Sequence, residues 1–421
     1  MPRILYISNS LPVPPTNGGK QRTNLLIRSL QRIADVDVIG ITASKVPKGE
    51  VEELRTDFGL IDLIKPSIHS DLQPWRTVRP LAPKLVQRLA HNLGNRKLDY
   101  RTSPRINEAI LKLTNDRAYD LAVGRYLLAT TQSGVIDRIP TILDVDDLDT
   151  QVYATRLNAP GESKFERWVV KRHLTQLEEI IPLRLAKIKH LWMASAKDLP
   201  LVSSHPEVSV LPNIPFAFAD RVPKAQPPAQ GGRLAIIVGS MNHPPNFRGV
   251  DRLVELVWPK VRQACPDALL RIIGTKTSDD QKRRWGASPG VEVAGFVPDL
   301  SDAYREASFT VCPIYEGGGT KIKVLESLAY NRACVTTEHS LHGYEHVLKD
   351  KESLRVVRTD EEMVQAVLEL FEQPSFAATM AEHGRKLVMD HFSFNRFAGV
   401  VQETVEKVLS KKDSSGLRAG E

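Results

Sequence analysis

Three consecutive glycines stand directly before two lysines in the stretch EGGGTKIKVLES, residues 316–327. Consecutive glycines allow positive φ and let the backbone approach a ligand closely. The residues that follow predict a helix beginning near Thr320, with Lys321 and Lys323 in its first turn. Helix starts favour acidic side chains, because unpaired N–H groups and the macrodipole make that end positive. The two lysines are therefore unfavourable there unless an anion offsets them, and the stretch predicts a diphosphate site.

A carboxylate follows about one turn later on the same predicted helix, at Glu326. Helical side chains lean toward the helix N-terminus, so this carboxylate can reach past the first turn. A carboxylate beside a phosphate site suits a pair of ribose hydroxyls. The alternative interpretation is a glycine-rich turn with solvated lysines. The predicted ligand-binding residues of the stretch are Gly318, Gly319, Thr320, Lys321, Lys323 and Glu326, of which Lys321 is our first choice for the diphosphate.

The elements around this stretch predict an α/β chain. Residues 3–8 and 36–42 read as strands that flank a glycine-containing loop and a helix, which is a βαβ unit and favours a parallel sheet. A second series of strands and helices starts at residue 233. We predict two Rossmann-like doubly wound domains that face a cleft, because open α/β sheets bind ligands beyond the carboxyl ends of their strands.

The predicted boundaries follow from composition. The first domain spans residues 1–215, a linker rich in proline spans 216–232, and the second domain spans 233–390. An amphipathic helix at 391–411 and a polar tail at 411–421 close the chain.

The apolar runs, the cysteines and the net charge indicate where the protein is located and what it can bind. No apolar run approaches ~18 residues, and the N-terminus does not resemble a signal peptide. Three scattered cysteines indicate free thiols in a reducing compartment.

The net charge of +7 attracts anions, and residues 74–105 are basic with interleaved apolar residues. This segment can lie on an anionic membrane surface, or be a helix packed on its own domain. No nucleic-acid motif accompanies the charge. We therefore expect a cytoplasmic protein, with peripheral membrane contact as the open alternative.

The order of these stretches resembles GT-B glycosyltransferases, specifically the large retaining group called family four. The resemblance rests on LPVPPTNGGKQR, LDVDDLDT, SAKD, VLPNI, VGSMNHPPN, the glycine–lysine stretch and VEVAGFVPDL, and covers most of the chain. The set looks like the branch involved in bacterial exopolysaccharide or cell-surface glycan assembly. The resemblance implies that the second domain binds a nucleotide-sugar donor, and that the last helix crosses back onto the first domain.

The resemblance also implies roles for individual residues. Glu326 matches the second Glu of the family's Glu-x7-Glu motif, which contacts the ribose. The first Glu would fall at Gly318, so Glu316, two residues earlier, is the candidate catalytic carboxylate. The family's Arg–Lys pair has no counterpart in register, and Arg248 is the nearest candidate to grip the diphosphate.

The first domain offers further candidates. Gly18 and Gly19 begin the first helix, where the family's loop borders the acceptor and the donor phosphate, and Arg22 adds a cation; the alternative is a simple βα turn. Many relatives carry a His after a strand of this domain, and this chain has Asp146 and Asp147 instead. A carboxylate there can stabilise charge or act as a base. The alternatives are helix capping, or a divalent metal bound by residues 144–146.

The resemblance therefore predicts transfer of a sugar from a nucleoside-diphosphate sugar to a glycan or lipid-linked acceptor, with retention of configuration. No cofactor and no divalent metal are expected. Two alternatives stay open: a nucleotide-sugar epimerase of the same fold, and an inactive scaffold that binds a sugar nucleotide or glycan.

Overall fold

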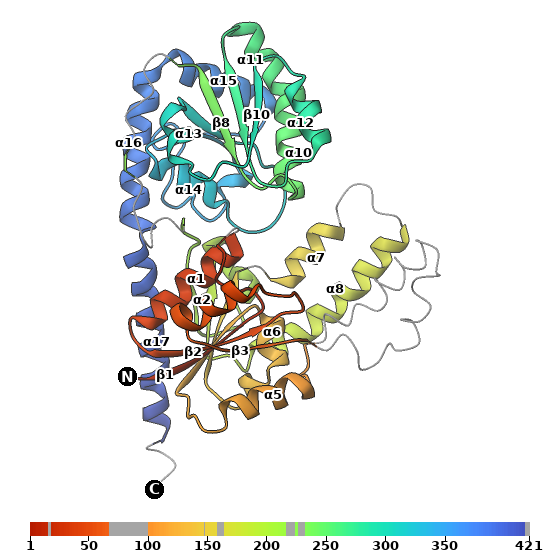
Figure 1. Cartoon of the computed structure of the whole chain (residues 1–421), viewed down its shortest axis with the longest axis vertical. Coiled ribbons are helices and arrows are strands. Elements are labelled where there is room, and N and C mark those ends of the chain that lie inside the picture. The colour runs from red at the N-terminus through yellow and green to blue at the C-terminus, as the bar shows by residue number, and fades with distance from the viewer. Residues whose placement is uncertain are drawn as a thin grey trace. The chain divides into compact units, whose positions relative to one another are not determined.

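The computed structural model describes residues 1–15, 18–66, 100–146, 148–157, 164–215, 224–225 and 232–416. The chain forms two compact units (Figure 1). Unit 1 contains residues 1–211 together with 398–421, and unit 2 contains residues 212–397. The predicted membrane segment at 74–105, the linker at 216–232, Asp147 and the tail end at 417–421 lie largely or wholly outside the described residues.

Unit 1 is built on a parallel sheet that has seven strands within the described residues, in the order β3-β2-β1-β4-β5-β6-β7. The strands are β1 (Arg3–Ser8), β2 (Asp35–Ile41), β3 (Leu60–Ile64), β4 (Leu121–Arg125), β5 (Thr141–Asp146), β6 (His190–Met193) and β7 (Val208–Val210). Its central strands are nearly continuous apolar runs, as expected where helices cover both faces of a parallel sheet. The chain runs outward from β1 to β3 and then returns to β4 beside β1, so a topological switch point lies between β1 and β4.

Six helices of unit 1 connect these strands within the described residues: α1 (Gly18–Gln31), α2 (Lys48–Phe58), α5 (Pro104–Thr114), α6 (Leu127–Gln132), α7 (Asp149–Leu157) and α8 (Lys164–Leu185). Helix α1 buries Leu25, Leu26 and Leu30 through its apolar face. It begins at Gly18, directly after the loop that leaves β1, so its first turn lies at the carboxyl edge of the sheet.

Unit 2 has the same plan with a six-stranded parallel sheet, in the order β10-β9-β8-β11-β12-β13. The strands are β8 (Leu234–Val238), β9 (Leu269–Ile273), β10 (Val291–Gly295), β11 (Phe309–Cys312), β12 (Cys334–Thr337) and β13 (Arg355–Val357). The helices are α10 (Pro244–Arg252), α11 (Trp258–Ala264), α12 (Asp279–Gly286), α13 (Ser301–Glu306), α14 (Ile322–Ala329), α15 (Asp360–Glu372) and α16 (Pro374–His391). The switch point of this sheet lies between β8 and β11.

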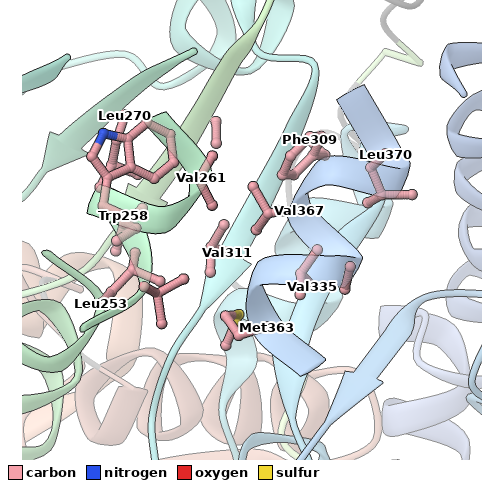
Figure 2. Packing of buried hydrophobic residues seen from close by; sticks show 14 of the residues in the cluster. Leu253, Trp258, Val261, Leu270, Phe309, Val311, Val335, Met363, Val367 and Leu370 are labelled. Carbon is pink, nitrogen blue, oxygen red and sulfur yellow. The ribbon is translucent and has the colours of Figure 1, made fainter. Parts of the chain in front are cut away.

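The main core of unit 2 lies between this sheet and helices that include α11 and α15. Figure 2 shows Trp258 and Val261 of α11 and Val367 of α15 packed over the strands. Each fully buried apolar side chain stabilises the fold by about 1.5–3 kcal/mol. Helices α10 and α11 are joined by a π-helical turn, Leu253–Val257. Pro259 has no N–H with which to continue the regular helical ladder, which accounts for a wider turn just before it.

The C-terminal helix α17 (Phe394–Gly416) belongs mainly to unit 1, which takes the chain from Ala398 onward. Trp192 of β6 donates a hydrogen bond from Nε1 to Thr404 Oγ1 on this helix, at 3.0 Å. Lys407 pairs with Glu207, beside β7, at 2.6 Å. The helix begins three residues later than the predicted 391–411 segment, because His391 ends α16. None of the described helices has the length and apolar content to cross a membrane.

The sheets agree with the predicted fold class of two Rossmann-like domains. Two strands were not predicted, β3 and β7. Both lie at edges of the unit 1 sheet, where one neighbour is missing. Strand β3 (LIDLI) is interrupted by Asp62 and has two buried residues in five, and β7 has only three residues, none fully buried, so both are short and weakly marked in the sequence.

Candidate functional site

Two helices begin at the switch point of unit 2. Helix α10 follows β8 and α14 follows β11, and these strands are neighbours. Neither helix has an acidic residue in its first turn. The second turn of α10 lies against the end of β11, because a Cβ on Gly249 would come within 2.0 Å of the Pro313 carbonyl oxygen. The positive ends of two helix dipoles therefore lie at the carboxyl edge of the sheet, where doubly wound sheets bind anionic ligands.

The glycine loop is a tightly fixed turn against α10. Gly317 and Gly319 have φ values of 92° and 68°, which side-chain-bearing residues rarely adopt. A Cβ on Gly317 would come within 2.8 Å of Pro245 Cγ. His339 lies 2.8 Å from the Gly317 carbonyl through Nε2, and since a carbonyl only accepts, Nε2 carries the proton. Glycine is therefore required here by both conformation and space.

Lys321 holds the other side of the loop. Its Nζ donates to the carbonyl oxygens of Gly318 and Gly319, at 2.8 Å each, and the residue is 8% exposed. Helix α14 begins at Ile322, two residues later than predicted, with Lys321 in a non-helical N-cap conformation. Thr320 does not cap the helix, because its Oγ1 accepts from Asn213 Nδ2 at 2.9 Å. The charge of Lys321 thus lies beneath the glycine loop, rather than extending into solvent.

Lys323 lies between the two helix starts. Its Nζ donates to Asn246 Oδ1 of α10 at 2.8 Å, and Asn246 Nδ2 in turn donates to the Ser240 carbonyl at 2.9 Å. A Cβ on Gly239 would come within 3.0 Å of the same Nζ, so the ammonium lies against the residue that follows β8. Burial lowers the pKa of Lys323. Its hydrogen-bond acceptor is a neutral amide, so an approaching anion would stabilise this ammonium strongly.

Glu326 lies one turn after Lys323 on α14. Its Oε2 accepts from the Tyr304 hydroxyl at 3.3 Å, and the Tyr304 ring stacks on Tyr330 with centroids 4.2 Å apart. Burial raises the pKa of Glu326, while Tyr304 and Lys323 act in the opposite direction. A half-buried carboxylate that already accepts a hydroxyl bond can accept a second one from a ligand diol.

Glu316 and Arg248 contact each other. Arg248 Nη1 lies 2.7 Å from Glu316 Oε1, and their side chains are 50% and 39% exposed. The structure therefore brings both predicted residues to the glycine loop, as an ion pair. Exposed pairs of this kind contribute about 0–1 kcal/mol, so a ligand can replace either partner.

Two histidines that were not among the predicted site residues also belong to this neighbourhood. His243 is the N-cap residue of α10, and burial together with the charges of Lys323 and Lys321 lowers its pKa. His339, below the glycine loop, has its pKa lowered by burial and by Lys321. In the sequence, each histidine lies within a few residues of the end of a strand. This position is the signal by which they could have been identified as site residues.

The predicted residues of unit 1 gather at its own switch point. Gly18 and Gly19 form the start of α1, which has no acid in its first turn. Arg22 lies on the inner face of the helix and is 2% exposed. Its Nε and Nη2 contact the two carboxylate oxygens of Asp144, at 2.9 Å (Oδ2) and 2.6 Å (Oδ1). The guanidinium of Arg22 is therefore held inside the unit by a bidentate ion pair.

Asp146 ends β5 with φ of +57° and pairs with Arg125 Nη2 at 2.8 Å. Asp144 pairs with Arg125 as well, so both carboxylates of the Asp-Val-Asp stretch face arginines. Among the residues that the structure describes, no group of three His, Cys, Asp or Glu side chains is arranged to hold a metal ion.

Comparisons with known proteins bear on both units. Residues 232–373 match a family model described as "Glycosyl transferases group 1". No curated protein sequence matches the chain. Sucrose-phosphate synthase from Thermosynechococcus elongatus matches with a TM-score of 0.66 and 14% identity, over 98% of this chain and 100% of that chain.

Two further solved structures are similar. The Anabaena protein HepE, in complex with UDP, has a TM-score of 0.63 and 10% identity, over 96% of this chain and 100% of its own. Trehalose 6-phosphate synthase from Burkholderia multivorans has a TM-score of 0.63 and 12% identity, over 100% of this chain and 99% of that chain. At these identities the likeness establishes the fold, which is GT-B with two Rossmann-like units.

Proposed function

We propose that the chain is a glycosyltransferase that moves a sugar from a nucleoside-diphosphate sugar to a glycan or lipid-linked acceptor. The observation that carries this proposal is the position of Lys323. Its half-buried ammonium lies between the starts of α10 and α14, beside a glycine loop with positive φ, at the switch point of unit 2. The family match over residues 232–373 and the UDP complex of a structural neighbour support a nucleotide-sugar donor.

The donor diphosphate lies against this cation in our proposal. Breaking the bond to the sugar leaves negative charge on the β-phosphate. Lys323 and the starts of two helix dipoles are fixed in place before this charge develops, which is the arrangement that lowers a barrier electrostatically. Lys321 acts indirectly, because it donates to two carbonyls of the glycine loop and so fixes the loop in place. We therefore favour Lys323 over Lys321 as the direct phosphate ligand.

Glu326 binds the ribose hydroxyls in this proposal, one helical turn from the phosphate. Its carboxylate already accepts from Tyr304, which fixes its orientation. Arg248 and Glu316 border the glycine loop, and donor binding separates their ion pair so that Arg248 contacts phosphate and Glu316 contacts the sugar.

The proposal also assigns the catalytic residues, the acceptor region and the cellular location. Asp146 and Glu316 are the candidate catalytic carboxylates, with retention of configuration and without a metal. Gly18 and Gly19 border the acceptor. A role in surface polysaccharide assembly, a cytoplasmic location and contact with an anionic membrane through residues 74–105 belong to the same proposal.

One observation favours a second candidate, a scaffold that binds a sugar nucleotide without turnover. Glu316 is occupied by Arg248, and a carboxylate held in an ion pair is poorly placed to act on a sugar. The two candidates predict the same nucleotide affinity and differ only in whether the sugar is transferred.

The proposal is tested by thermal shift with UDP, GDP and ADP and with their sugar conjugates. Stabilisation by one nucleoside diphosphate, but not by its nucleoside, is expected. The matching sugar nucleotide is then incubated with a panel of acceptors, and release of the nucleoside diphosphate is measured. A protein that no nucleotide stabilises would contradict the donor site, and binding without release across the panel would favour the scaffold.

A further inference from the structure

Asn213 brings a buried side-chain amide to the start of α14. It lies three positions after the end of β7 and is 6% exposed. The Tyr344 hydroxyl donates to its backbone carbonyl at 3.3 Å, and its own Nδ2 donates to Thr320 Oγ1 at 2.9 Å. Tyr344 is fully buried, and its ring packs edge-on against Phe392 with centroids 5.3 Å apart. The backbone of Asn213 is therefore held by Tyr344, and its side chain in turn fixes the oxygen of Thr320.

The direction of this hydrogen bond decides where the proton of Thr320 can go. An amide N–H only donates, so the Thr320 oxygen uses a lone pair for Asn213 and its own proton is directed elsewhere. Several threonines of the chain donate this proton to a carbonyl one helical turn earlier, as Thr131 does to Leu127 at 2.9 Å. Within the residues that the structure describes, no acceptor takes the proton of Thr320.

The three carbonyls that precede Thr320 already have donors. Those of Gly318 and Gly319 each accept from Lys321 Nζ at 2.8 Å. The carbonyl of Gly317 accepts from His339 Nε2, also at 2.8 Å. The glycine loop therefore does not draw the hydroxyl proton of Thr320 back onto its own backbone, and this proton is available to a ligand.

The groups around Thr320 indicate a negatively charged acceptor. The side chains within three positions of it, on either side, carry the cations of Lys321 and Lys323 and no acid. Helix α14 has no acid in its first turn, and its N-cap residue makes no side-chain hydrogen bond to that turn. A neutral sugar hydroxyl needs an acceptor as well as a donor, whereas a phosphate oxygen only accepts. A hydroxyl that donates to an anion forms a short, strong hydrogen bond, so a phosphate oxygen suits this proton best.

We propose that Asn213 is a positioning residue that turns the hydroxyl proton of Thr320 toward a phosphate oxygen of the donor diphosphate. Asn213 itself does not contact the ligand. The inference rests on the proposed function for the identity of that diphosphate, and it adds a second phosphate-binding group beside Lys323. The sequence indicated Thr320, whereas nothing in the sequence connected it with Asn213, which lies 107 positions earlier.

Asn213→Asp reverses this hydrogen bond while keeping the size of the side chain. A carboxylate only accepts, so the Thr320 proton must turn toward position 213 and away from the ligand. The affinity for a diphosphate should fall roughly tenfold or more, because a hydrogen bond to a charged group is lost and a negative charge is added. Asn213→Ala leaves the hydroxyl free to rotate, so we expect a loss below about threefold.

Two variants of Thr320 separate the loss of this proton from the added charge. Thr320→Val removes the hydroxyl at a similar volume and should weaken diphosphate binding roughly tenfold, whereas Thr320→Ser keeps the hydroxyl and should stay within about threefold of the natural protein. In the Thr320→Val background, Asn213→Asp should cause a smaller loss than it does alone, because residues that act together are not additive.

Titration calorimetry measures these affinities with inorganic pyrophosphate, and with UDP, GDP and ADP beside uridine, guanosine and adenosine. The affinity for the nucleoside should be unchanged in every variant, which shows that unit 2 remains folded. Tyr344→Phe is the matched control. It removes the hydrogen bond to the Asn213 carbonyl and leaves the amide donor in place, so the diphosphate affinity should be unchanged.

Four results would contradict these proposals. The inference is overturned if Asn213→Asp binds diphosphate as well as the natural protein, or if Tyr344→Phe or the nucleoside shows an equal loss. It is also overturned if Asn213→Asp causes the same loss with and without the Thr320 hydroxyl, because charge alone then explains the effect. A natural protein that binds pyrophosphate but no nucleoside diphosphate contradicts the proposed function, and the pyrophosphate affinities of the variants then decide the inference. A natural protein that binds neither overturns both.

Discussion

Replacing Lys323 by Met tests the donor site most directly. Met matches the unbranched stem of the lysine side chain but removes the ammonium that donates to Asn246 between α10 and α14. The fold should survive, because burial lowers the pKa of Lys323 and the uncharged side chain avoids that penalty. The affinity for a nucleoside diphosphate should fall.

The expected loss follows from the interaction that disappears. A hydrogen bond to a charged group contributes about 1.5–3 kcal/mol, and the Coulomb term at 4 Å is about 4 kcal/mol at an effective dielectric constant near 20. In the free protein, removing the ammonium also avoids part of the cost of desolvating that group, which reduces the net loss. A net loss of about 2–3 kcal/mol corresponds to about 30- to 150-fold weaker binding.

Titration calorimetry with UDP, or with whichever nucleoside diphosphate stabilises the protein most, measures this loss. The corresponding nucleoside is the internal comparison, since it has no phosphate and its affinity should not change. Lys260→Met is the control variant, because Lys260 is an exposed lysine of unit 2 that pairs with Glu361. A change in diphosphate affinity below about threefold, or an equal loss for the nucleoside, would refute the assignment of Lys323.

Four further predictions concern the same residues. Lys321→Met should lower the melting temperature, measured by calorimetry, because the carbonyls of Gly318 and Gly319 lose their donor; an unchanged melting temperature would contradict this. The raised pKa of Glu326 makes its ionised form destabilising once the pH exceeds its unfolded pKa, so Glu326→Gln should melt higher at pH 8 and equally near pH 4. A bound diphosphate should raise the lowered pKa of His243, so affinity should increase from pH 8 to pH 6 with proton uptake, measured calorimetrically in two buffers of different ionisation enthalpy; His243→Asn should reduce both effects. Asp144→Asn leaves two buried arginines without their shared carboxylate and should cost about 3–5 kcal/mol in urea denaturation, whereas a cost below about 1 kcal/mol would show that the pair is dispensable.

Central strands of both sheets were predictable because each is buried on both faces and therefore appears as an apolar run. The edge strand β3 was not, since it is five residues long and Asp62 interrupts its apolar run. The glycine loop was predictable because only glycine tolerates its φ values.

The partners of the charged residues were not predictable. Arg248 and Glu316 are 68 positions apart, and Arg22 and Asp144 are 122 apart, so their pairing depends on the folded sheets. From the sequence, Lys321 was the first choice for the diphosphate, whereas our proposal favours Lys323. The non-helical backbone at Lys321 turns that side chain onto the loop, whereas Lys323 lies on the helix and reaches α10.

Helix α17 has a consequence for the order in which the protein is synthesised. The residues that complete unit 1 from Ala398 onward are translated after the whole of unit 2. Until then the ribosome-bound chain holds Trp192 without the Thr404 hydroxyl and Glu207 without Lys407. Unit 2 is contiguous and can fold first, whereas unit 1 must wait for the last tens of residues. A chain that ends at residue 397 should therefore show protease resistance in unit 2 and reduced resistance in unit 1.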